Sequence, residues 1–222
     1  MADGHQPASG ADLVVRRLRE YGVSVVFGYP GGQLTPLYDA LARDGRIRHV
    51  LARDEQAAAF MADGFARATG QPGVCLAVCG PGVLNAATPL ATAFTDSVPV
   101  LLLSGQIPRA GRGPRSGYYH ENDQLSACAT LTKCQARAEQ VGQIVPLLDR
   151  AWATLTAGRP GPVLFEVPQW ISAAAPIVMI HAPRIPALTT LRRLFMVTIP
   201  ICIDPIMRIA AVTLLKSYNA DA

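Results

Sequence analysis

Apolar and polar positions along the first 170 residues alternate between helical and strand-like patterns. Leu13, Val14, Leu18 and Tyr21 share one face of a helix over residues 11–21, and arginines occupy the other face. Short continuous apolar runs, typical of buried strands, alternate with further helical segments. We predict strands at 23–27, 48–52, 74–78, 98–104, 133–138 and 163–167. We predict the other helices at 34–43, 55–69, 80–93 and 142–156.

This alternation predicts an α/β domain with a mostly parallel sheet and helices on both faces. Ligands of such sheets bind beyond the carboxyl ends of the strands. Four segments follow predicted strand ends and should therefore gather at one edge: Tyr29–Gly32, Glu55, Gly80–Asn85 and Gly105–Gln106. Residues 105–125 form a polar loop that is long enough to suggest a functional role.

The composition divides the chain into three parts. We expect a flexible N-terminus at 1–10, the α/β domain at 11–169, and an irregular tail at 170–222. All 19 glycines lie at or before Gly161. Prolines and charges interrupt the longest apolar stretch of the tail, so we favour a poorly ordered or loosely docked segment over a membrane span. The tail's composition, which differs from that of the rest of the chain, also fits a frameshifted gene end.

Composition and charge exclude several classes of protein. The 222 residues carry a net charge of only +4, without a basic run interleaved with aromatics, so we expect no nucleic-acid partner. The five cysteines lack framework spacing, and Cys75 and Cys79 fall in one apolar run. Buried free thiols are therefore expected rather than metal ligands. Because the N-terminus lacks a signal-peptide pattern, we expect a cytoplasmic, reducing setting.

Three local features could carry chemistry. Glu55 stands in the first turn of an alanine-rich helix, where a carboxylate also simply complements the helix dipole. The turn Gly28–Gly32 has neither dinucleotide-binding nor P-loop spacing. In Gly80–Gly82, glycine would let the backbone approach a ligand. Each signal is weak alone, but the three together are specific.

From Gly22 to Gln169 the chain resembles the N-terminal, pyrimidine-binding domain of thiamine diphosphate-dependent enzymes, above all that of acetolactate synthase large subunits. The resemblance rests on VFGYPGGQLTPLYDAL, DEQAAAFMADGFARATG, GPGVLNAATPLATAFTDSVPVLLLSGQIPR and TAGRPGPVLFEVP. It implies thiamine diphosphate as the cofactor. It also implies one half-site of a 2-keto acid decarboxylase or carboligase.

The resemblance assigns a catalytic role to Glu55. Its carboxylate would hydrogen-bond a ring nitrogen of the aminopyrimidine and make the imino tautomer accessible. The implied cofactor-binding residues are Tyr29, Pro30, Gly31, Gly32, Glu55, Gly80, Pro81, Asn85 and Gln106. Asn85 has a second interpretation, as a polar residue in the first turn of its helix.

Three positions depart from the family pattern. Asp54 replaces a histidine, Cys79 replaces a serine, and Tyr119–Asp123 replaces a Phe-Gln-Glu-x-Asp segment. The resemblance implies that His120 stands where acetolactate synthases carry a substrate-facing glutamine, which puts that activity in doubt. His120 is either a substrate residue or a solvated loop histidine.

The family's diphosphate- and magnesium-binding segment does not appear in the 222 residues. Magnesium would therefore be supplied by another domain or subunit, and the sequence does not decide for or against FAD. Ala58, Ala62, Phe65 and Ala66 form a stripe that is either core or a dimer contact. Two functions remain: an enzyme half-site acting on a 2-keto acid, as a homodimer or with a diphosphate-binding subunit, and a non-catalytic truncated domain acting through subunit pairing.

Overall fold

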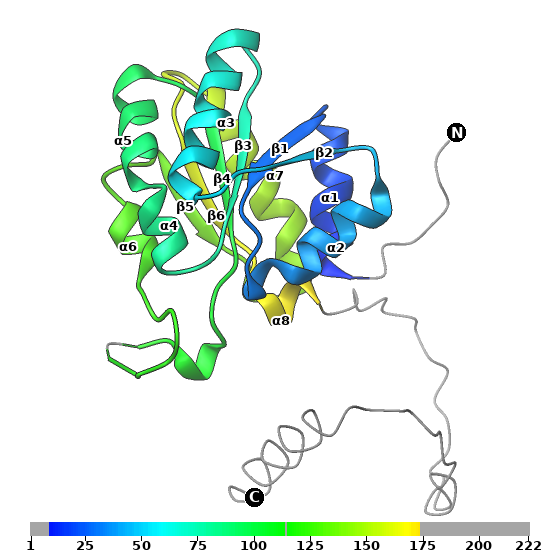
Figure 1. Ribbon diagram of the computed structural model, residues 1–222, viewed down its shortest axis with the longest axis vertical. Coiled ribbons are helices and arrows are strands. Elements are labelled where there is room, and N and C mark those ends of the chain that lie inside the picture. The colour runs from blue at the N-terminus through cyan, green and yellow to red at the C-terminus, as the bar shows by residue number, and fades with distance from the viewer. Residues whose placement is uncertain (1–8, 114, 174–222) are drawn as a thin grey trace, which may run out of the picture. The chain divides into compact units, whose positions relative to one another are not determined.

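The computed structural model describes residues 9–113 and 115–173 (Figure 1). The expectations for residues 1–8 and for the tail after residue 173 lie outside this part of the chain. The strands are β1 (Val25–Gly28), β2 (Arg48–Leu51), β3 (Gly73–Ala77), β4 (Val100–Ser104), β5 (Cys134–Arg137) and β6 (Val163–Glu166). The α-helices are α1 (Gly10–Glu20), α2 (Thr35–Asp44), α3 (Glu55–Thr69), α4 (Pro81–Asn85), α5 (Ala87–Asp96), α6 (Gln124–Cys128), α7 (Ile144–Thr156) and α8 (Gln169–Ser172). The 3-10 turns are η1 (Gly32–Leu34), η2 (Arg109–Gly111) and η3 (Val141–Gln143).

The six strands form one parallel sheet in the order β2-β1-β3-β4-β6-β5. This confirms the predicted fold class. The register pairs Ala77 with Ser104 and Ser104 with Glu166, so β3, β4 and β6 end side by side. The turns that leave these strands therefore begin next to each other.

Helices cover both faces of the sheet (Figure 1). Leu101 and Leu103 of β4 pack in a core with residues of α1, α2 and α7. Val100 and Leu102, which point the opposite way, pack in a second core with residues of α3 and α5. The continuous apolar strands thus supply both cores, as expected of a sheet buried on two sides.

The α/β domain extends a few residues beyond both of its predicted boundaries, 11 and 169. Ser9 caps α1 by accepting a hydrogen bond from the Asp12 amide at 3.2 Å, so the helix begins inside the segment predicted to be flexible. A Cβ on Gly10 would lie 2.3 Å from the Ile171 carbonyl oxygen of α8. Ile171 is itself buried in the first core. The domain therefore includes residues 9–10 and continues past 169.

Two elements differ from the sequence prediction. The single helix expected at 80–93 divides at Ala86 into α4 and α5. Pro89 has no N–H to bond the Asn85 carbonyl four residues earlier, which explains the break at that point. A short helix, α6, begins at Gln124 inside the predicted loop.

The alanine stripe on α3 is core. Ala58, Ala62 and Ala66 are all buried in the second core, and the Phe65 ring lies 6.0 Å from that of Phe27 on β1. These side chains face their own sheet because α3 packs directly on β1 and β3. The three alanines of the stripe are therefore core residues, and Phe65 is partly buried beside them.

Candidate cofactor site

Glu55 begins α3 and is 7 % exposed. Asp54 caps the helix by accepting a hydrogen bond from the Gln56 amide at 2.9 Å, which fixes the backbone around Glu55. Asn85 Nδ2, at the end of α4, donates to Glu55 Oε2 at 3.1 Å. Among the described residues, Asn85 is the one side chain that hydrogen-bonds this carboxylate. Its other oxygen keeps its acceptor capacity.

That second oxygen lies against Gly82. A Cβ at Gly82 would stand 2.9 Å from Glu55 Oε1 and 2.6 Å from Val78 Cγ1. On the other side of Val78, a Cβ at Gly31 would stand 2.6 Å from Val78 Cγ2. Two glycine turns therefore meet at Val78, and the missing side chain at Gly82 leaves Glu55 Oε1 uncovered. This arrangement leaves an acceptor oxygen for a flat N–H-bearing group.

Gly80 has a positive φ of +66°, which favours glycine, because the chain turns sharply from β3 into α4. A Cβ here would lie 2.4 Å from the His120 carbonyl oxygen, so the loop over residues 105–123 packs directly on this turn. The Gly80 amide donates to Gln124 Oε1 at 2.7 Å. Gln124 is fully buried.

A pocket of about 500 Å³, which we call the arginine pocket, lies beyond β4 and β5 and is lined in part by Gln106, Arg112, Asn122 and Arg137. Gln106 is 1 % exposed, and its Oε1 accepts a hydrogen bond from the neighbouring Ile107 amide at 2.8 Å. The buried Gln106 side chain therefore lines this pocket.

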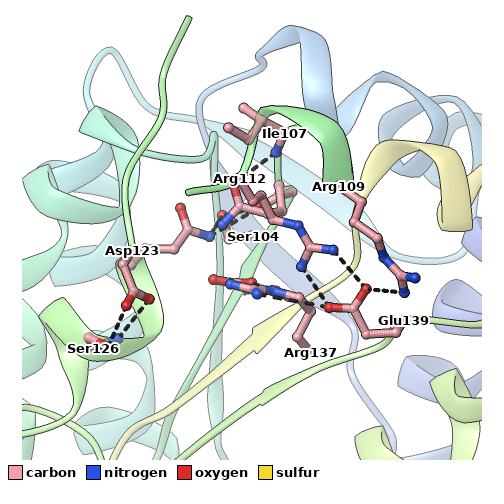
Figure 2. A network of polar contacts seen from close by, with 12 residues as sticks. Ser104, Ile107, Arg109, Arg112, Asp123, Ser126, Arg137 and Glu139 are labelled. Carbon is pink, nitrogen blue, oxygen red and sulfur yellow. Dashed lines mark hydrogen bonds and ion pairs between the residues drawn. The ribbon is translucent and has the colours of Figure 1, made fainter. Parts of the chain in front are cut away.

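Arginines and glutamates form a network beside the arginine pocket. Figure 2 shows the Arg109 and Arg112 side chains converging on Glu139, at 3.0 Å from Arg109 and at 2.6 and 2.9 Å from Arg112. The hydrogen bonds from Arg112, supported by Arg109, lower the pKa of Glu139 to about 2. The Glu139 carboxylate therefore stays charged at any ordinary pH.

Glu166, at the end of β6, belongs to the same network but is fully buried. Burial raises its pKa above the ordinary glutamate value. The Arg137 guanidinium, which is bonded to Glu166, and the Gln124 and Gln106 amides offset part of that rise. The carboxyl ends of β4, β5 and β6 thus carry a polar cluster behind the glycine turns.

Comparison with known proteins shows that the chain matches the model of one protein family. Residues 8–127 match the family model for the thiamine pyrophosphate enzyme, N-terminal TPP binding domain. The chain belongs to the thiamine pyrophosphate enzyme family.

Relatives that match this TPP binding domain include several acetolactate synthases. It is 45 % identical over 161 residues to the isozyme 3 large subunit of Escherichia coli (strain K12), covering 72 % of this chain and 28 % of that protein. It is 41 % identical over 164 residues to the chloroplastic acetolactate synthase of Arabidopsis thaliana, covering 74 % and 24 %. It is 42 % identical over 160 residues to a probable large subunit of Methanocaldococcus jannaschii, covering 72 % and 27 %. The chain spans about a quarter of the length of these relatives.

The structure brings together part of the predicted cofactor set of the TPP binding domain. Gly31 and Gly80 lie in turns that leave neighbouring strands, and Asn85 contacts Glu55 directly. Tyr29, which is 44 % exposed, and Pro30, Gly32 and Pro81 are also exposed on these turns. The interpretation of Asn85 as a residue of the first helical turn is wrong, because Asn85 is the last residue of α4.

Two further predicted residues lie after β4. Gln106 lines the arginine pocket, as described above. His120 reaches the Gly80 turn through its carbonyl oxygen, while its ring stacks on Tyr119 with 3.8 Å between centroids. His120 has a positive φ of 66°, so the loop conformation rather than the imidazole makes the contact.

Sequence reasoning missed three residues of the site. Gly82 was visible in the Gly-Pro-Gly turn, but only the structure shows its approach to Glu55. Val78 ends an apolar run and carries no signal of its own. Gln124 was assigned to a loop, and no local pattern marks a buried glutamine.

Other features of the TPP binding domain concern thiols, metals and membranes. Burial raises the pKa of Cys79 to about 12 and that of Cys128 to about 11, as expected for core thiols. Within residues 9–113 and 115–173, no group of three or more acidic, histidine or cysteine side chains is arranged to hold a metal ion. No helix in the same part of the chain is long and apolar enough to span a membrane.

Proposed function

We propose that the described domain forms the half-site that binds the aminopyrimidine end of thiamine diphosphate in an acetolactate synthase-like 2-keto acid decarboxylase or carboligase. The observation that carries the proposal is the Glu55 carboxylate, which is buried, held at one oxygen by Asn85, and uncovered at the other beside Gly82. The family match supports the same cofactor.

The residues present fit the pyrimidine end of the coenzyme. Bound thiamine diphosphate supplies a thiazolium carbon that adds to the carbonyl group of a 2-keto acid. Glu55 Oε1 would accept a hydrogen bond from the pyrimidine ring and hold a proton at that ring nitrogen. Asn85 keeps the carboxylate oriented, and the Gly31 and Gly82 turns let the backbone approach a flat ring. The exposed Tyr29 side chain would cover its edge.

A binding experiment tests the cofactor role. The full chain is titrated with thiamine diphosphate and Mg²⁺, and the amide signals of Gly80 and Gly82 are followed by NMR. A hydrogen bond to a charged group contributes about 1.5–3 kcal/mol, so Glu55→Gln should weaken binding about ten- to a hundred-fold. Glu20→Gln removes an exposed carboxylate on α1 and should leave binding unchanged. Equal affinities for all three chains would disprove the role of Glu55.

The catalytic part of the proposal is tested by pairing the chain with a second subunit. Mixing the chain with the Escherichia coli large subunit, whose residue aligned with Glu55 has been changed to glutamine, should restore activity through mixed dimers. Failure to restore activity despite co-purification of the two chains would contradict the proposed half-site.

A second candidate, pairing without catalysis, is favoured by an exposed apolar face. Phe60 and Met61 of α3, Leu84 of α4 and Phe94 of α5 are each 40–43 % exposed, and these three helices pack against one another on one face of the sheet. We propose that this face pairs with a second copy or with a relative. Phe60→Ser combined with Phe94→Ser should then shift the sedimentation equilibrium toward monomer. A wild-type chain that is monomeric at high concentration and that binds no relative would rule out this role.

A further inference from the structure

Gln124 is a fully buried neutral amide at the first position of α6. A buried amide must satisfy its donors and acceptor inside the protein. Asp123 caps the same helix turn by accepting a hydrogen bond from the Ser126 amide, and the Ser126 hydroxyl donates to it at 2.6 Å (Figure 2). This cap fixes the backbone at Gln124, and the Gln124 side chain points into the protein interior.

The Gln124 side chain connects the ends of two neighbouring strands. Its Oε1 accepts from the Gly80 amide at 2.7 Å, just after β3. Its Nε2 donates to Ser104 Oγ at 3.2 Å and to the Gly105 carbonyl oxygen at 3.1 Å, at the end of β4. Both kinds of polar atom in the amide are thus in use.

These contacts link the two strands beyond the end of their backbone pairing. The last paired residues of β3 and β4 are Ala77 and Ser104. A side-chain amide has the same donor and acceptor groups as a peptide unit. Gln124 accepts from one strand end and donates to the other, as a peptide group placed between them would do.

We call the Gln124 link between the ends of β3 and β4 the joint, and it lies next to the proposed pyrimidine site. Gly80 is two residues before Gly82, which contacts the Glu55 carboxylate. A Cβ at Gly105 would lie 2.8 Å from Gln33 Cβ, so the end of β4 also packs on the segment that follows Gly31 and Gly32. Fixing Gly80 against Gly105 therefore fixes all three turns relative to one another.

We infer that Gln124 is a positioning residue that holds the Gly80 and Gly105 turns in the arrangement required by the coenzyme's pyrimidine ring. This inference rests on the proposed function of the Glu55 site. Gln124 does not touch the coenzyme; it acts through the Gly80 backbone. Its loss should reduce coenzyme affinity by more than its effect on stability explains.

The test compares Gln124→Met with a matched control, Gln135→Met, in the full chain. Methionine keeps the length of the side chain and removes its hydrogen bonds. Gln135 Nε2 donates to the Thr132 carbonyl oxygen at 3.3 Å and to Thr132 Oγ1 at 2.5 Å, far along the chain from the glycine turns. Its substitution therefore makes the same chemical change and removes donated hydrogen bonds at a partly buried site without a proposed cofactor role.

Two quantities are measured: hydrogen exchange at the Gly80 amide and the dissociation constant for thiamine diphosphate with Mg²⁺. Gln124→Met should speed Gly80 exchange at least ten-fold and weaken coenzyme binding about ten-fold, whereas Gln135→Met should change neither. Equal binding losses in the two variants, or unchanged Gly80 exchange in Gln124→Met, would overturn the inference.

Two further outcomes are distinguishable. If Gln124→Met does not fold, the wild-type chain still decides whether the joint exists, because a Gly80 amide that exchanges as fast as an exposed loop amide would contradict the joint. If the wild-type chain binds no thiamine diphosphate, the proposed function fails and the positioning role fails with it. A protected Gly80 amide would in that case show only that Gln124 joins the two strand ends.

Discussion

Arg137→Met should destabilise the protein strongly, because it removes the cation beside a fully buried carboxylate. Arg137 Nε is bonded to Glu166, whose side chain has no exposure to solvent. Methionine fills much of the same apolar space without a charge. The variant therefore isolates the electrostatic effect of the guanidinium.

The structure sets the size of the effect. Removing one partner of a buried ion pair costs about 3–5 kcal/mol, because the other charge stays buried without compensation. The Gln106 and Gln124 amides still face Glu166 and still lower its pKa, and the Arg137 side chain is itself 18 % exposed. We therefore expect a loss near the lower limit, about 3 kcal/mol at pH 8.

The loss should depend on pH with a definite sign. The pKa of Glu166 is already raised in the folded state by burial, and Arg137 opposes that rise. Without Arg137 the folded-state pKa rises further. A group whose pKa is higher in the folded state favours folding most below its unfolded-state pKa, and this contribution is lost as the pH rises through the folded-state pKa. The deficit of the variant relative to wild type should therefore shrink as the pH falls from 8 to 5.

Urea unfolding followed by circular dichroism at pH 5 and pH 8 measures this deficit. Glu166→Gln added to Arg137→Met should recover most of the lost stability at pH 8, because no buried charge remains. The reasoning is refuted if Arg137→Met loses less than about 1 kcal/mol at pH 8, or if the double variant is no more stable than the single one.

Two further predictions concern the Glu55 site. Gly31→Ala should lower the free energy of unfolding, measured in urea, by about 1–3 kcal/mol, because its Cβ would overlap Val78 Cγ2. Gly32→Ala, whose Cβ would have no atom within 4 Å, should stay within about 0.5 kcal/mol of wild type. Equal losses in the two variants would contradict the packing argument. Asn85→Leu should weaken thiamine diphosphate binding several-fold, measured by NMR titration, and should lower the unfolding free energy by about 1–3 kcal/mol, because it removes the Asn85 hydrogen bond to the largely buried Glu55 carboxylate. An unchanged affinity would show that Glu55 needs no partner.

The fold could be predicted because its signals are local. Continuous apolar runs mark buried strands, and the helix predicted at 55–69 is α3 from Glu55 to Thr69. The break at Ala86 was also readable in principle, since Pro89 cannot bond the carbonyl four residues earlier. Local periodicity does not show which partner a face meets, so it left open whether the Ala58 stripe is core or contact.

The site could be predicted only where a motif marks it. Glu55 and the glycine turns stand at strand ends and resemble a known family, so they were named from the sequence. The burial of Gln106 in the arginine pocket depends on how the loop after β4 folds back. Gln124 is 44 residues from Gly80, and such a pairing is determined by tertiary structure alone.

The sheet order has a consequence for how the protein behaves at high concentration. The edge strands, β2 and β5, are four residues long, and within residues 9–113 and 115–173 no strand pairs with their outer sides. Strand edges of this kind are where one molecule can add to the sheet of another. Arg48, which is exposed, begins β2 and places a cation on that edge, which disfavours strand-to-strand aggregation. The buried parallel strands between them, which are far more apolar, are thereby kept from templating fibres while the domain stays folded.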